Sequence, residues 1–166
     1  TGLFDEVTSV DSISLETASL STQGRLETSA SGREAAHLSR LSVDGWFNAP
    51  VSYWPGLTDD SGRVEVRGGV VDMSDQESDD SEDYGDYELV LRPDRVIIEE
   101  GVELHGVRGR ITTKGGYRGQ FSGRVNGGAF VTGEIRPGDK ILIAAKDGGR
   151  ALRDAEILSD AYGGEL

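Results

Sequence analysis

Apolar and polar residues alternate along most of this chain, most regularly between Val107 and Ala145. The segment contains four runs in which every second residue is apolar or small and the residues between them are mostly polar. A period of two residues is typical of β-strands that bury one face and expose the other to water. Turn sequences separate the runs, at Gly115-Gly116, Asn126-Gly127 and Pro137-Gly138. The pattern predicts four consecutive antiparallel strands, which form a β-meander.

Shorter alternating runs precede the meander. Strands are predicted around Val64 to Val66 and Leu89 to Leu91, and a turn at Glu99 to Gly101 separates two more. A strand from Leu41 is expected to end at Asn48-Ala49-Pro50, because proline has no N–H for a central ladder. The first forty residues, rich in Ser and Thr with isolated aliphatics, predict short half-exposed strands and a helical turn over residues 32–38.

The period becomes helical at Asp147, which is a suitable N-cap. Ala151, Leu152, Ala155 and Leu158 then mark an apolar stripe, so one short helix is predicted from Asp147 to Leu158. A helix of this length is unstable alone and has to pack on the sheet. The predicted fold is therefore mainly β: an antiparallel meander with one short helix near the C-terminus.

Length and composition fit this prediction. A chain of 166 residues is long enough for one domain with a hydrophobic core, and we expect a single domain over residues 1–166. Its 24 glycines, about twice the usual share, suit a protein with many hairpins. The chain has no cysteine, which excludes disulfides and thiolate metal sites.

The net charge of −13 argues against a nucleic-acid partner, which needs a basic surface. Eight of the acidic residues lie between Ser74 and Glu88, in a segment without a basic residue. This segment is predicted to be a flexible, solvated hairpin loop. A calcium site there is the weaker interpretation, because the segment lacks the D-x-[DN]-x-[DN]-G spacing.

No motif in the sequence indicates catalysis. His37 and His105 are the only histidines, which makes a histidine-based zinc site improbable, and neither lies near a G-x-S-x-G nucleophile pattern. The sequence has no phosphate-binding loop, and nothing singles out a carboxylate pair for sugar hydrolysis. We therefore expect no enzyme, no cofactor and no metal site. A hydrolase acting on glycan is kept only as a hypothesis for assay.

The apolar faces of the strands have two possible explanations. They can form an ordinary dry core against a second layer, or they can form an open trough that holds lipid. Both need the same alternation, so the pattern alone leaves the choice open. The chain contains no apolar run of the ~20 residues needed to span a bilayer. It begins at Thr1 rather than with an initiator Met, so we expect it to be a piece of a longer protein.

Several segments resemble the AsmA-like proteins of proteobacterial envelopes, and in particular the YhdP-like subset. The most specific segment is DGGRALRDAEILSDAYGGEL at 147–166, preceded by GQFSGRVNGGAFVTGEIRP at 119–137. LSVDGWFNAP at 41–50 and VEVRGGVVDM at 64–73 are also similar to that family. The resemblance covers about residues 41–166 and implies that this chain is an internal segment of such a protein.

The resemblance implies a non-enzymatic protein that is anchored in the inner membrane by segments absent from this chain and extends through the periplasm. The resemblance implies a curled, groove-like β-sheet that would carry phospholipid toward the outer membrane, with a role in outer-membrane biogenesis. Other envelope proteins would be its partners. The helix would brace or cap the trough. The residues expected to line it are Ile111, Tyr117, Phe121, Val125, Val131, Ile135, Ile141 and Ile143. The alternative is a structural or protein-interaction β module of the envelope with a dry core.

Overall fold

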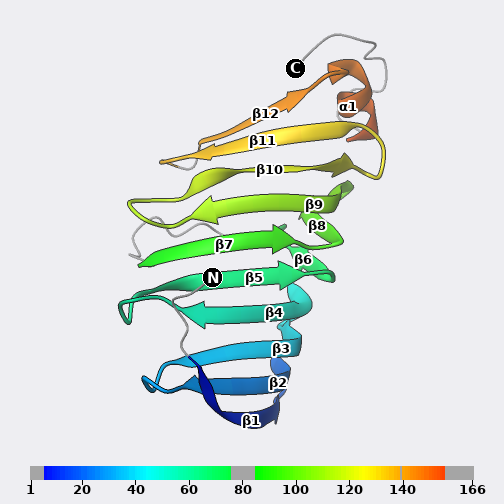
Figure 1. Cartoon of the computed structure of the whole chain (residues 1–166). Coiled ribbons are helices and arrows are strands. Elements are labelled where there is room, and N and C mark those ends of the chain that lie inside the picture. The colour runs from blue at the N-terminus through cyan, green and yellow to red at the C-terminus, as the bar shows by residue number, and fades with distance from the viewer. Residues whose placement is uncertain (1–5, 76–84, 139, 156–166) are drawn as a thin grey trace.

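The computed structural model describes residues 6–75, 85–138 and 140–155. Its strands belong to a single sheet, and one short helix follows the last strand (Figure 1). The mainly β fold predicted from the alternation is confirmed. The elements are β1 (Val7–Glu16), β2 (Leu20–Ser29), β3 (Glu34–Val43), β4 (Phe47–Pro55), β5 (Ser61–Arg67), β6 (Val70–Asp72), β7 (Asp86–Arg92), β8 (Arg95–Glu99), β9 (Val102–Thr112), β10 (Arg118–Val125), β11 (Phe130–Arg136), β12 (Lys140–Ala145) and α1 (Gly148–Asp154).

The strands lie in the sheet in the order in which they occur in the chain, from β1 at one edge to β12 at the other. Strands β9 to β12 pair antiparallel with their neighbours, so the predicted meander is confirmed. The turn at Asn126-Gly127 is also confirmed, since both residues have positive φ and Gly128 N–H donates to Val125 O (2.7 Å).

Two bent strands cross the middle of the sheet. β5 and β6 are halves of one strand interrupted at Gly68-Gly69, and β4 pairs with both halves. β7 and β8 are likewise separated by Pro93-Asp94, and β9 pairs with both. The two bent strands run parallel to each other, β5 beside β7 and β6 beside β8.

This parallel pairing shows that the expected hairpin between Ser74 and Glu88 is wrong. Met73 N–H donates to Ile97 O (2.8 Å) at the far end of β8, whereas Asp86 N–H donates to Asp60 O (2.8 Å) beside the start of β5. A hairpin would bring these two ends together, but parallel strands need a connection that returns along their length. Strand β7 also begins inside the expected loop, at Asp86. Residues 76–84 lie outside the described chain.

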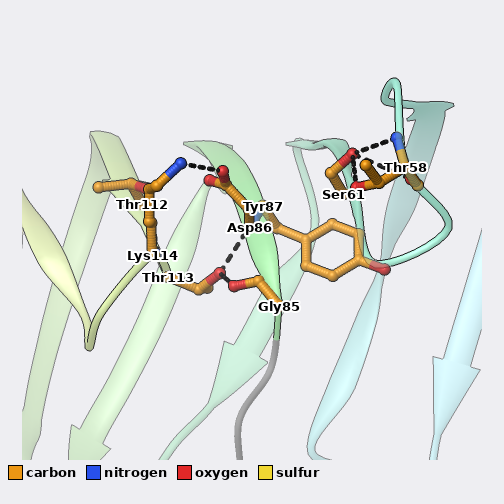
Figure 2. Close-up of polar contacts among 8 residues, drawn as sticks. All are labelled: Thr58, Ser61, Gly85, Asp86, Tyr87, Thr112, Thr113 and Lys114. Carbon is orange, nitrogen blue, oxygen red and sulfur yellow. Dashed lines mark hydrogen bonds and ion pairs between the residues drawn. The ribbon is translucent and has the colours of Figure 1, made fainter.

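A set of polar contacts holds the start of β7 in the sheet (Figure 2). Thr113 Oγ1 accepts from Tyr87 N–H (2.9 Å) and donates to Gly85 O (2.6 Å). Lys114 Nζ lies 2.6 Å from Asp86 Oδ2. Thr113 and Lys114 directly follow β9, so these contacts fix where β7 starts in the sheet. Thr113 is buried, so water does not compete for these two hydrogen bonds.

Two further predictions in the N-terminal half are wrong. Residues 32–38 are not helical, because most of them belong to β3, which pairs with both β2 and β4. Pro50 does not end a strand but lies inside β4. On one side of β4, its pairing with β3 has a register shift between Leu38 and Leu41, directly opposite Pro50. On the other side of β4, its pairing partner changes from β5 to β6 near the same position. Proline is tolerated in a central strand where both neighbouring ladders are already irregular.

The helix begins as predicted, with the Asp147 carboxylate accepting from Arg150 N–H (2.8 Å). Its described part ends at Asp154, so the expected extension to Leu158 lies outside the described residues. Ala151 and Ala155 pack against Leu104, Val107 and other buried residues of β9 to β12. The helix therefore covers one corner of the sheet. Asn126 ties this corner together, since its amide donates to Gly101 O and Asp154 O (2.8 and 2.5 Å).

Candidate functional site

The main candidate site is one face of the sheet, which we call the apolar face. Cross-strand neighbours point to the same side, so the register determines the composition of each face. One unbroken row of cross-strand neighbours takes one residue from each of ten successive strands of the sheet. These residues are Ile13, Gly24, Leu38, Val51, Val66, Leu91, Gly109, Phe121, Gly133 and Ile143. Every residue in this row is aliphatic, aromatic or glycine.

A second row on the same face has nearly the same character. It consists of Asp11, Leu26, Ala36, Tyr53, Val64, Leu89, Ile111, Gly119, Ile135 and Ile141. Asp11, on the edge strand, is the single charged residue among them. The apolar face therefore extends from one sheet edge to the other, well beyond the meander for which a trough was predicted.

The structure places seven of the eight predicted lining residues on this face, and no strand pairing assigns the eighth, Tyr117. Ile111, Phe121, Ile135, Ile141 and Ile143 belong to the two rows, and Val125 and Val131 lie beside them. Tyr117 precedes β10 by one residue and has the same parity as Phe121. The sequence pattern thus assigned these side chains to a common face, while leaving open what covers it.

The coverage of the apolar face is uneven. Val125 and Val131 are buried in the cluster that includes α1, and Ile111 is buried beside β7. In contrast, Ile141 and Ile143 are 56% and 51% exposed on the edge strand β12, and Tyr117 is also exposed. Phe121 is half-buried, and its ring lies over Gly133, where a Cβ atom would collide with it. The face is closed at the α1 corner and open along β12.

The opposite face, which we call the polar face, carries two shallow grooves. The larger has a volume of about 1010 Å³ and the smaller about 520 Å³. The larger groove crosses β7 and β9 to β12, with Arg108, Arg110, Gln120 and Thr132 among its lining residues. Phe121 and Ile143 also line it, but their side chains point to the apolar face, so only their backbone can form its floor. Neither groove is the predicted lipid trough.

A buried carboxylate lies on the polar face of β5. Glu65 is only 3% exposed, and its Oε1 atom is 2.9 Å from Arg67 Nε. Arg63 and Arg92 each approach its carboxylate to 3.9 Å. The hydrogen bond from Arg67, helped by the three positive charges, holds the pKa of Glu65 below its usual value although burial acts in the opposite direction. Glu65 is therefore a charged anchor for arginines on this face.

His37 lies in a polar contact that sequence reasoning missed. Its Nδ1 atom is 3.2 Å from Ser52 Oγ and its Nε2 atom 3.3 Å from Glu27 Oε2. A Ser–His–Glu line of this kind is the pattern of a hydrolase triad. However, Ser52 lies in the middle of β4, which pairs with β3 on one side and β5 on the other. The backbone N–H groups around it therefore form hydrogen bonds within the sheet and are not free to make an oxyanion hole. Glu27 is also held by Arg25 at 2.7 Å. We interpret the group as a cross-strand polar ladder.

Three comparisons with known proteins add no assignment: no family model, no curated protein and no solved structure matches the chain. Within residues 6–75, 85–138 and 140–155, no group of three or more His, Cys, Asp or Glu is placed to bind a metal ion. The helix in the described part is too short to cross a membrane. The acidic segment, weighed above for calcium, falls largely on residues outside the described chain.

Proposed function

We propose that this chain is a non-enzymatic segment of an AsmA-like envelope protein whose apolar face holds the acyl chains of phospholipid. The observation that carries the proposal is the pair of apolar rows that crosses the whole sheet. In the described residues, α1 is the one element that packs over this face from outside the sheet. A β-sandwich would instead cover the face with a second sheet.

The dimensions of the face suit an extended apolar ligand. Neighbouring strands are spaced by roughly 4.8 Å, so ten strands give a track on the order of 40 Å long. An acyl chain needs no hydrogen-bond partner, so such a track can hold it with side chains alone. Where this apolar surface stays exposed, as along β12, it is unfavourable in water and is typical of a binding surface. Bound lipid would remove that surface from water.

The cellular setting in this proposal rests on the resemblance of 41–50, 64–73 and 119–166 to the AsmA-like family. It comprises a periplasmic location, an inner-membrane anchor outside this chain, and transport of phospholipid toward the outer membrane. Other envelope proteins would be partners. The geometry of the sheet supports the lipid-binding part of the proposal independently of this setting.

A second function is supported by one observation. The cluster of Leu104, Val107, Val125 and Val131 is sealed by Ala151 and Ala155 of α1. If the same kind of coverage extends over the rest of the face in the whole protein, the chain is a structural or protein-interaction module with a dry core. The two functions differ in what contacts the exposed residues of β12.

The test uses two adjacent residues on β12 as a matched pair. Ile143 is 51% exposed on the apolar face, and Leu142 is 48% exposed on the polar face. A photocrosslinking amino acid is placed at each position in the full-length protein in cells, and adducts are identified by mass spectrometry. Phospholipid adducts at position 143 and not at 142 are expected, because only the former faces the track.

Other outcomes contradict the lipid proposal. Protein adducts alone at position 143 would favour the interaction module. Equal phospholipid adducts at both positions would indicate nonspecific contact with membrane. Position 121 beside position 120 provides a second pair inside the sheet, where an edge effect cannot produce the difference.

A further inference from the structure

The lining of the two polar-face grooves has a charge opposite to that of the whole chain. The chain carries −13, with 30 acidic residues. Yet the grooves are lined by five arginines and a single carboxylate, Glu134. The arginines are Arg92, Arg108, Arg110, Arg118 and Arg136. The fold has thus collected positive charge on one surface of an acidic protein.

Three of these arginines are engaged by carboxylates. Arg136 binds Glu134 through two contacts of 3.0 Å, Arg110 lies 2.9 Å from Glu88, and Arg92 is 3.9 Å from Glu65. Arg108 and Arg118 have no carboxylate partner among the described residues, and both are exposed. An anion can therefore bind these two without first breaking an ion pair, although Arg108 Nη1 also donates to Val107 O (2.7 Å).

Arg108, Arg110 and Arg118 form a line on the polar face. Arg108 and Arg110 are two positions apart on β9, and Arg110 pairs with Gln120, which is two positions from Arg118 on β10. Consecutive members are therefore on the order of 7–8 Å apart at the backbone. This spacing suits a ligand with several anionic groups rather than one. Arg110 lines both grooves and joins them into one site.

The type of cation indicates the type of anion. All five groove cations are arginine, and none is lysine. The planar guanidinium binds phosphate and carboxylate with paired hydrogen bonds, whereas lysine acts as a point charge. The uncharged lining residues Gln120, Ser122 and Thr132 add hydroxyl and amide groups that can bond to sugar hydroxyls.

A polypeptide ligand fits this surface poorly. Extended peptides bind sheets by adding to an edge, where free backbone groups pair with theirs. Here Arg108, Arg110 and Arg118 lie on β9 and β10, which are paired on both sides and have no free ladder positions. The edge strand β12 borders only one end of the larger groove. A ligand without backbone amides leaves no such groups unsatisfied.

From these observations we infer that the joined polar-face grooves form a binding site for a saccharide that bears several phosphate groups. Arg108 and Arg118 bind the phosphates, and Gln120, Ser122 and Thr132 bind hydroxyls. The site lies on the face opposite to the proposed lipid track, so it stands or fails separately from the lipid proposal.

The test is calorimetric titration of the whole chain with fructose 1,6-bisphosphate, a saccharide with two phosphate groups and free ring hydroxyls, at fixed ionic strength. The variants are Arg108→Gln and Arg118→Gln, with Arg40→Gln as the matched control. Arg40 is an exposed arginine on β3, outside both grooves, so its replacement causes the same charge change elsewhere. Saturable binding is expected, weakened about tenfold by each groove variant, the size expected for one charge-assisted contact, and unchanged in the control. Thermal unfolding of each variant verifies that the sheet is retained.

Three results would overturn the inference. The first is no binding, and the second is an equal loss in Arg40→Gln, which would indicate nonspecific attraction. The third concerns ligand class. If poly-L-glutamate displaces fructose 1,6-bisphosphate at equal charge concentration, the site takes an acidic polypeptide. If pyrophosphate binds equally well, the site does not recognise the ring hydroxyls.

Discussion

At the scale of single residues, how much a charged side chain contributes to stability depends on how deeply it is buried. Glu65 is the most buried carboxylate that the structure describes, and it lies among three arginines that approach from β5 and β7. Exposed pairs such as Lys114 with Asp86 add little to stability, because water screens them. Glu65 differs, since loss of its charge would leave a desolvated oxygen and weaken contacts to all three guanidinium groups.

Glu65→Gln is expected to lower the free energy of unfolding at pH 7 by about 2 kcal/mol, the size of hydrogen bonds to a charged group. The pKa of Glu65 is lowered in the folded state, so its stabilisation is complete above the unfolded pKa of about 4.3 and is lost as pH falls through the folded value. The difference between the two proteins should therefore shrink below pH 4. Urea unfolding at pH 7 and at lower pH measures it, and a difference independent of pH would contradict the assignment.

At the scale of elements, the bend between β5 and β6 determines the central part of the sheet. Gly69 has φ +73°, and a Cβ atom there would collide with the backbone of Asn48 and Ala49 in β4. The close approach lets β4 pair with both halves of the bent strand. Glycine is therefore required at this position for two reasons, its positive φ and the missing side chain.

A comparison of Gly69→Ala with Gly32→Ala separates the two reasons. Gly32 has a similar φ of +80° but nothing near its missing Cβ. Gly32→Ala should cost about 1 kcal/mol from backbone strain alone. Gly69→Ala should cost about 2 kcal/mol more, because β4 must move away. Thermal or urea unfolding of both variants provides the measurement, and equal losses would show that the contact with β4 is unimportant.

At the scale of the whole molecule, one sheet presents an apolar face on one side and an arginine-lined polar face on the other. Along the polar face the register row between the two apolar rows reads Ser12, Arg25, His37, Ser52, Glu65, Val90, Arg110, Gln120, Glu134 and Leu142. The two faces differ enough to bind ligands of opposite character. Helix α1 is the element that limits the apolar face, at the corner of β9 to β12.

Ala151→Glu should undock α1 and enlarge the open part of the apolar face. Ala151 is 7% exposed, so a charge there should cost about 2–4 kcal/mol in the docked state. We expect increased binding of a fluorescent fatty acid with the strand content retained in circular dichroism. Arg150→Glu places the same side chain at an exposed position of the helix and should leave binding near the starting level. Unchanged binding in Ala151→Glu would show that α1 does not limit the face.

Local pattern was sufficient to predict much of this fold. The alternation from Val107 to Ala145 specified four strands and their two faces, because a side-chain period of two is a property of each strand by itself. Asn126-Gly127 specified its turn through the positive φ that these residues tolerate, and Asp147 specified the start of the helix through its carboxylate. The same alternation assigned seven of the eight proposed lining residues to the face on which the strand pairing places them.

The tertiary structure decided the features that depend on distant neighbours. The parallel pairing of β5 with β7, the place of Pro50 inside β4 and the strand over 32–38 all depend on which strands lie alongside, and local preference does not contain that information. The same holds for the continuous apolar rows, the corner covered by α1 and the arginine line of Arg108, Arg110 and Arg118. Each arises from register between segments far apart in the chain. Alternation determined which side chains share a face within a strand, and only pairing determined which strands place those faces together.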